Sequence, residues 1–106
     1  MTKIDKSMLD KLRSFGETVR DFRERRGLLL RQVASELEVD MAFLSKMERN
    51  EKKASRPQIL KLAKTLEIDQ DELMTLWLSD RLLDMLKEEK VAYDVLKLTE
   101  KRIKQR

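Results

Sequence analysis

Apolar side chains between residues 30 and 47 recur at the spacing expected for two short helices joined by a tight turn. The positions are Leu30, Val33, Ala34, Leu37, Val39, Leu44 and Met47. Asp40 stands just before the second apolar group, and aspartate is a favoured N-cap residue. The pattern predicts helices over residues 30–37 and 41–49 that cross near a right angle, with Val39 buried in the turn between them.

Capping signals predict further helices on both sides of this pair. Polar residues three apart that suit a capping box are Ser14 with Glu17, Ser55 with Gln58, and Asp69 with Glu72. Gly27 is placed to end the first of these helices in the left-handed conformation, and Asn50 can end the helix before it in the same way. Pro57 falls in a first helical turn, where its missing N–H costs little. We therefore expect helices that begin near residues 15, 56 and 70, the last of which runs to about residue 87.

Amphipathic stripes of apolar residues also occur near the two ends of the sequence. Ile4, Met8 and Leu12 suit a short amphipathic helix over residues 3–13. A further helix from about residue 91 would present a wide stripe of Ala92, Val95, Leu96, Thr99 and Ile103. This stripe could fold back over its own domain, but an exposed apolar stripe is a liability on a monomer. We favour a partner subunit as its cover, and we expect an N-terminal helical extension at 1–13, a main domain at 14–79 and a C-terminal helical extension for dimerisation at 80–106.

Composition narrows the fold and the chemistry. Charged residues make up 42% of the 106 residues and aromatic residues 5%, with two glycines and one proline, which favours an all-α fold. The lack of cysteine and histidine removes disulfides, thiolate zinc sites, cysteine nucleophiles and histidine general bases. We therefore expect no metal, no cofactor and no enzymatic activity. The sequence has no apolar run of signal-peptide length and none near the roughly 18 residues of a membrane span, which favours a soluble cytoplasmic protein.

Positive charge is concentrated in the N-terminal third of the chain. The net charge is +4 at pH 7. Residues 3–31 hold nine Lys/Arg against five Asp/Glu, whereas residues 57–106 hold ten of each. A basic surface attracts polyanions such as nucleic acid, although a chain this rich in charge shows local excesses in any case.

Together, these segments resemble the phage-repressor-like helix-turn-helix family, the Xre or Cro/repressor type of bacterial transcription regulators. The resemblance covers residues 14 to about 78, and the matching runs are Phe15–Arg23, Arg26–Leu28, Leu30–Ala34, Leu44–Arg49 and Ile59–Leu66. It implies a five-helix lambda-repressor-like DNA-binding domain with a C-terminal helical extension. In that arrangement the second helix of the central pair lies in the DNA major groove.

Three positions depart from the family's commonest pattern. Glu38 stands in the turn where glycine is usual, and a left-handed residue other than glycine costs about 1 kcal/mol. Leu30 replaces a glutamine that meets a phosphate in many members, which leaves Arg31 to make that contact. Asn50 replaces a glycine, which is a mild chemical change.

By this resemblance, the helix over residues 41–49 reads DNA. The base-reading candidates are Met41, Ala42, Phe43, Ser45 and Lys46, and the phosphate-contact candidates beside them are Arg31, Arg49, Lys52, Lys53 and Arg56. Phe43 could equally pack beneath the helix, and Lys46 could simply be solvated. The family pairs the positions of Arg23 and Glu48, so the resemblance assigns them a structural ion pair.

The resemblance implies a sequence-specific regulator of transcription that binds double-stranded DNA, by default an autoregulatory repressor that lies in the cytoplasm with the nucleoid. It would act as a homodimer on a palindromic operator, and the dimerisation candidates are Trp77, Leu83, Leu86, Val95, Leu96 and Ile103. Trp77 could instead belong to the core. Two other functions stay open: an antitoxin whose C-terminal helices bind a toxin, which is less favoured, and a helical protein–protein adaptor without DNA binding. No small-molecule ligand and no membrane partner is expected.

Overall fold

The computed structural model describes residues 13–106, and these residues form six helices and no strands. The helices are α2 (Phe15–Arg25), α3 (Leu30–Leu37), α4 (Met41–Glu48), α5 (Arg56–Leu66), α6 (Gln70–Leu86) and α7 (Ala92–Gln105). The all-helical prediction is confirmed for this part of the chain. The helix expected over residues 3–13 lies, apart from Arg13, outside the described residues. None of the six helices is both long and apolar enough to traverse a lipid bilayer.

Short polar side chains begin four of the helices where the sequence predicts them. Ser14, Asp40 and Asp69 accept hydrogen bonds from the backbone N–H groups three residues further on, at 3.2, 2.7 and 3.0 Å. Ser55 does the same at 3.4 Å, and the glutamine three residues on accepts the Ser55 N–H at 2.9 Å, which completes a capping box. At α2 the Glu17 carboxylate instead accepts from the Ser14 hydroxyl at 3.0 Å.

Four helices end with a residue in the left-handed conformation. These residues are Gly27, Glu38, Asn50 and Glu67, with φ of 66°, 58°, 63° and 55°. In each case the next residue donates its N–H to the carbonyl five residues earlier, at 2.8 to 3.0 Å, as in a Schellman motif. Glu38 therefore takes the conformation that its place in the turn requires. Each of the two glutamates also pairs with a neighbouring helix, Glu38 with Lys61 at 3.3 Å and Glu67 with Arg26 at 2.6 Å.

The hydrophobic core lies between α2, α3, α4, α5 and the first part of α6. Its largest fully buried side chains are Val19, Val33, Leu44, Met47, Ile59, Leu62, Leu66 and Leu73. Trp77 adds a buried aromatic ring from α6, and its indole N–H donates to the Ala54 carbonyl at 3.1 Å. Trp77 is thus a core residue rather than a dimerisation contact, because a ring this buried presents little surface to a partner.

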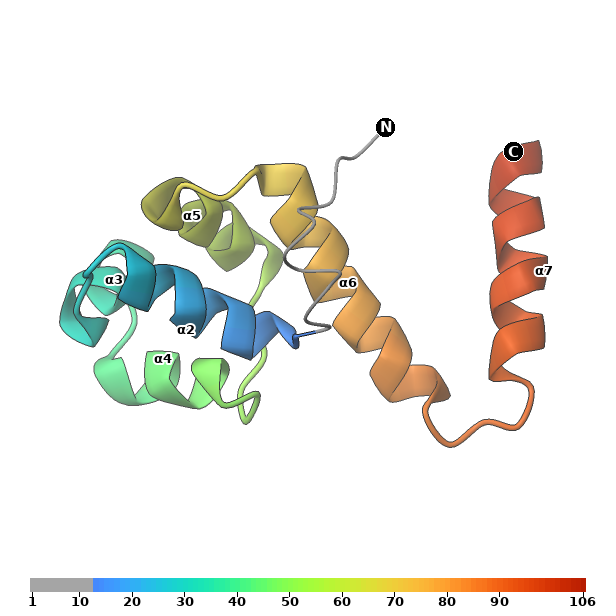
Figure 1. Cartoon of the computed structure of the whole chain (residues 1–106), viewed down its shortest axis with the longest axis horizontal. Helices are drawn as coiled ribbons and strands as arrows, with labels where there is room; N and C mark the ends of the chain where they lie inside the picture. The colour runs from blue at the N-terminus through green and yellow to red at the C-terminus, as the bar shows by residue number, and fades with distance from the viewer. Residues whose placement is uncertain (1–12) are drawn as a thin grey trace.

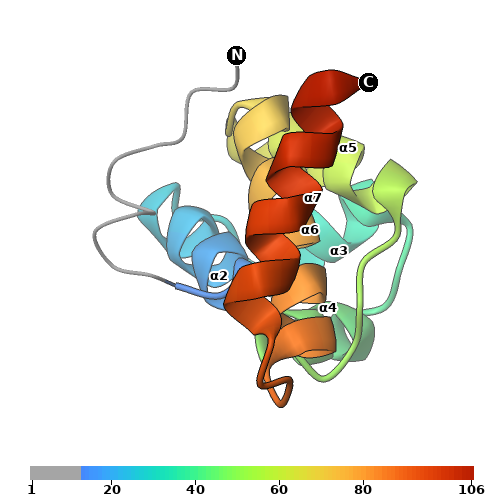
Figure 2. The ribbon, with the colours of Figure 1, turned by 90° about the vertical axis from the view of Figure 1, so that its right-hand side faces the viewer.

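The last two helices extend away from this core. Helix α6 is continuous through residue 79, where we expected the main domain to end. Figure 1 shows α6 and α7 as the two arms of a V, joined at its base by residues 87–91. Figure 2 shows α7 on the outer side of α6, away from α2 and α4. Leu86 is buried near the base of the V, whereas α7 has no buried residue.

Candidate nucleic-acid interface

Helices α3 and α4 form the pair that the apolar pattern predicts. Ala34 is buried between them, and its carbonyl accepts the Val39 N–H at 3.0 Å, which closes the turn. Val39 packs against the core and Asp40 caps α4, so the turn from residue 38 to residue 40 is fixed at each position. The second helix therefore has one buried face, from Leu44 and Met47, and one open face.

A bidentate ion pair ties α4 to α2. Arg23 Nε donates to Glu48 Oε2 at 2.7 Å and Nη2 donates to Oε1 at 3.2 Å, in the pairing that the resemblance implies. Both side chains are largely covered, with 12% and 5% of their surface exposed. Arg23 Nη1 also donates to the Leu28 carbonyl at 2.9 Å, so the same guanidinium fixes the connection between α2 and α3. The hydrogen bonds that Arg23 donates to Glu48 raise the pKa of Arg23 above its ordinary value, and desolvation acts in the opposite direction.

Gly16 allows α2 to approach the end of α4 closely, a role that sequence reasoning did not assign to it. A Cβ atom at this position would lie 2.6 Å from the carbonyl oxygens of Met47 and Glu48 and 2.6 Å from Asn50 Oδ1. Asn50 Oδ1 accepts the Gly16 N–H at 3.1 Å, and Asn50 Nδ2 donates to Ser14 Oγ at 2.9 Å. Asn50 thus ends α4 and also holds the start of α2 against it.

Asp80 makes a second contact to the start of α2, which the sequence does not reveal. Its carboxylate, on α6, accepts the Phe15 N–H at 2.7 Å. Burial raises the pKa of Asp80, and the hydrogen bond from Phe15 lowers it by a smaller effect. Together with Asn50, this contact joins the start of α2 to both α4 and α6, so the orientation of α4 is fixed relative to α6.

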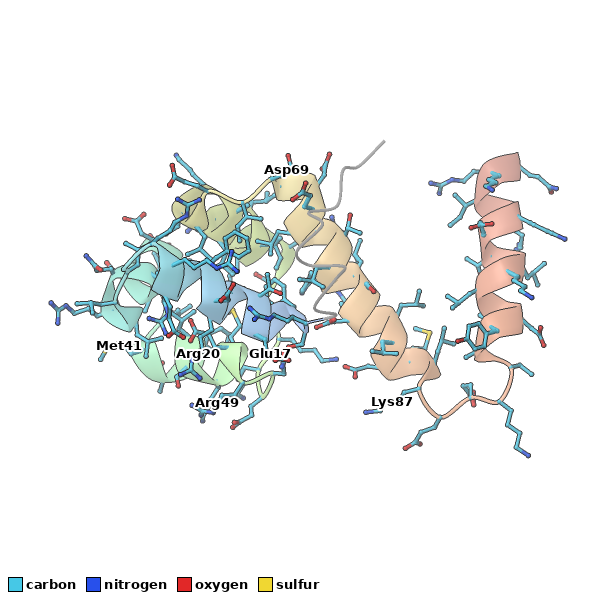
Figure 3. The ribbon with its side chains drawn as sticks, in the orientation of Figure 1. Glu17, Arg20, Met41, Arg49, Asp69 and Lys87 are labelled. Carbon is cyan, nitrogen blue, oxygen red and sulfur yellow. The ribbon has the colours of Figure 1, made fainter. Side chains whose placement is uncertain are left out.

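The open face of α4 carries three of the five base-reading candidates. Met41, Ala42 and Lys46 are exposed. Ser45 is half-buried, and its hydroxyl accepts from Arg49 Nη1. Phe43 is half-buried and packs against the core, which favours the packing role considered for it. Figure 3 shows Met41 and Arg49 at the two ends of this face, on the edge of the molecule.

The cations around α4 divide into two groups. Within residues 13–106, Arg31, Lys46 and Lys52 are exposed and have no hydrogen bond or ion pair. The other three phosphate-contact candidates, Arg49, Lys53 and Arg56, already contact other residues of the protein. Arg31, Lys46 and Lys52 are therefore the cations that can bind an anion without first breaking a contact.

Three candidates already have partners in the fold. Arg49 donates to Glu51 at 2.7 Å, and this hydrogen bond raises the pKa of Arg49 and lowers that of Glu51. The Lys53 Nζ atom lies 3.6 Å from Asp84 Oδ2. The Arg56 guanidinium lies 5.6 Å from the centroid of the Trp77 ring, directed toward α6. Each of these three cations would have to leave a contact within the fold before it could bind a phosphate.

Comparison with known proteins agrees with this geometry. Residues 14–76, which are more than half of the chain, match the model of the helix-turn-helix domain family. The chain belongs to this family. A helix-turn-helix domain supports DNA binding, and domains of this kind are typically not enzymes. No curated protein and no solved structure matches the chain. The matched part of this helix-turn-helix protein ends within α6, so α7 lies outside it.

Proposed function

We propose that this helix-turn-helix protein is a sequence-specific regulator of transcription, and that α4 is its recognition helix. We assign it to the Xre, Cro/repressor type, with α2 to α6 as a five-helix lambda-repressor-like domain. The observation that carries this proposal is the open face of α4, where Met41, Ala42 and Lys46 are exposed on a helix that Arg23 and Glu48 hold in place. A recognition helix needs this combination, because its side chains must reach the bases from a fixed position.

The residues of this face suit different parts of the DNA. The Lys46 ammonium can donate to guanine O6 or N7, and the apolar side chains of Met41 and Ala42 can contact a thymine methyl group. Arg31 and Lys52 flank the helix, and they would bind phosphates and set the register without reading sequence. In this scheme the half-buried Phe43 supports the helix from below and reads no base.

The protein would act as a homodimer and repress by occupying a promoter, including its own. Two copies related by twofold symmetry would present their α4 helices to half-sites about 34 Å apart, one turn of DNA. The operator would then be a palindrome, because the symmetry of the protein imposes its own symmetry on the site.

Selection of bound sequences from random duplex DNA tests this function. We expect enrichment of a palindrome whose half-site centres lie about 10 base pairs apart. Affinity for the selected duplex should exceed that for a shuffled duplex by about a thousandfold or more. Enrichment of no sequence, with weak binding to all duplexes, would contradict the proposal and favour a protein–protein adaptor.

An antitoxin is the second candidate, because the exposed apolar side chains of α7 would also suit a toxin as partner. Purification of the natively expressed protein distinguishes the two. A second protein present in fixed stoichiometry, and lost when α7 is removed, would favour the antitoxin. Purification of this chain alone would favour the regulator.

A further inference from the structure

The V between α6 and α7 carries most of the exposed apolar surface of the described chain. Nine of the twelve exposed large hydrophobic residues in residues 13–106 lie there, with 41% to 81% of each exposed. We call this set the C-terminal apolar face: Leu78, Leu82, Leu83, Met85, Val91, Tyr93, Leu96, Leu98 and Ile103. The other three exposed residues are scattered over the connection to α3, α4 and α5, so the concentration is specific to this end of the molecule.

Helix α7 has little cover within its own chain. None of its residues is buried, and Figure 1 shows the ribbons of α6 and α7 approaching each other only at the base of the V. A groove of about 380 Å³ lies between the two helices there, with Leu83, Leu86 and Leu96 among its lining residues. An isolated helix of 14 residues is marginal in water, because most helical stability comes from tertiary packing. Helix α7 therefore lacks, within the described part of its own chain, the packing that usually stabilises a helix of this length.

The charges of the two helices are complementary. Helix α7 carries four Lys/Arg and two Asp/Glu, whereas α6 carries four Asp/Glu and one Arg. Two of the α6 carboxylates, Asp80 and Asp84, already have partners within the chain. A partner of opposite net charge would therefore suit each arm of the V: acidic opposite α7 and basic opposite α6. A second copy of this chain offers both at once, because a twofold axis that places α7 of one copy against α6 of the other also places α6 of the first against α7 of the second.

The amount of exposed apolar surface also fits a second copy. Nine large side chains at these exposures present on the order of 900 Å² in total, distributed over the two helices and the connection between them. A stable interface buries about 800 Å² on each partner. The C-terminal apolar face is thus of the size that one copy contributes to a standard dimer.

We propose that a second copy of this chain covers the C-terminal apolar face, with α7 of each copy packed against α6 of the other. This inference rests on the proposed function, and it deepens it by naming the interface that sets the separation of the two recognition helices. Helix α6 is fixed to the DNA-binding unit through the Trp77 indole on the Ala54 carbonyl and the Asp80 carboxylate on the Phe15 N–H. An interface on α6 therefore positions both copies of α4.

Disulfide trapping tests whether α7 contacts α6 of a second copy. The chain suits this method because its sequence has no cysteine. The full-length variants Leu83→Cys and Leu96→Cys are purified separately, mixed and oxidised. We expect an 83–96 disulfide between two chains to form in the mixture. Leu60→Cys, at a residue of α5 with the same 41% exposure as Leu96, is the matched control and should not trap with Leu83→Cys.

Sedimentation equilibrium without DNA gives the second measurement. The wild-type chain should sediment at twice its 12.6 kDa. Leu96→Glu should weaken dimerisation by about thirtyfold or more, as loss of a central interface side chain does, whereas Leu60→Glu should leave it unchanged.

A wild-type monomer at high micromolar concentration would overturn the proposal. So would a dimer that Leu96→Glu leaves intact, or a mixture in which Leu83→Cys and Leu96→Cys form no more mixed disulfide than Leu83→Cys and Leu60→Cys do. Failure of the proposed function looks different, because the dimer would form and trap as expected but select no DNA sequence.

Discussion

The helix-turn-helix unit and the C-terminal V belong to one chain but differ in how far their apolar side chains are buried. In α2 to α5 and the first part of α6, eight large side chains are completely buried and four helix ends are closed by left-handed residues. In α7 no residue is buried. The first region is complete within one chain, and we propose that a second copy completes the second.

This difference assigns separate tasks to the two regions. DNA recognition needs side chains held at fixed positions, and the unit provides this through polar contacts that join α2 to α4 and α6: Arg23 with Glu48, Asn50 with Gly16, and Asp80 with Phe15. Association needs exposed apolar surface, and the V provides it. Substitutions should therefore affect folding in the first region and self-association in the second.

The largest expected effect on folding comes from the ion pair between α2 and α4. Glu48→Ala leaves the Arg23 guanidinium largely buried without its carboxylate, and loss of one partner of such a pair costs about 3 kcal/mol. Urea unfolding, compared at equal chain concentration, measures the loss.

The matched control for Glu48 lies on α7. Glu100 accepts from Lys104 at 3.5 Å, and both side chains are exposed. Glu100→Ala should leave the unfolding free energy within about 0.5 kcal/mol of wild type. Equal losses of unfolding free energy in Glu48→Ala and Glu100→Ala would contradict the distinction between the two regions.

A smaller effect is expected where α2 meets α4. Alanine in a helix is usually better than glycine by up to about 1 kcal/mol, yet Gly16→Ala should destabilise the unit by about 2 kcal/mol. The reason is the added Cβ, which would lie 2.6 Å from two backbone carbonyl oxygens that cannot easily move. Thermal and urea unfolding measure the change.

Gly27→Ala is the control that distinguishes steric crowding by an added Cβ from strain in the backbone. Gly27 has φ of +66° and no atom within 4 Å of an added Cβ, so this variant should lose only about 1 kcal/mol, from left-handed strain alone. A Gly16→Ala variant as stable as wild type would show that α2 and α4 can separate, and the recognition helix would then be less rigid than the contacts indicate.

Much of the helix-turn-helix unit could be predicted because its signals are local. The apolar spacing, the caps at Ser14, Asp40, Ser55 and Asp69, and the left-handed residues Gly27 and Asn50 all act within a few residues of their own positions. The roles of Gly16 and Asp80 could not be predicted in this way. Their contacts span 34 and 65 residues of sequence, so no pattern near either residue indicates its partner.

The candidate site was predicted in outline but not in the state of each side chain. The resemblance names ten residues for DNA contact, and the structure shows which of their side chains already have partners. Phe43 packs inward, and Arg56 lies over the Trp77 ring because α6 passes beside the start of α5. Such competition for a side chain depends on tertiary neighbours, which composition and spacing do not specify.

The most direct test of the central claim, that α4 reads bases, compares Lys46→Ala with Lys52→Ala on the selected duplex and on a shuffled one. Lys46→Ala should weaken binding to the selected duplex by about 1–3 kcal/mol and leave the shuffled duplex nearly unaffected. Lys52→Ala should weaken binding to both duplexes equally. It should also reduce the slope of log K against log salt concentration by about one. Equal loss on both duplexes from Lys46→Ala would contradict the account, because Lys46 would then be one more phosphate contact.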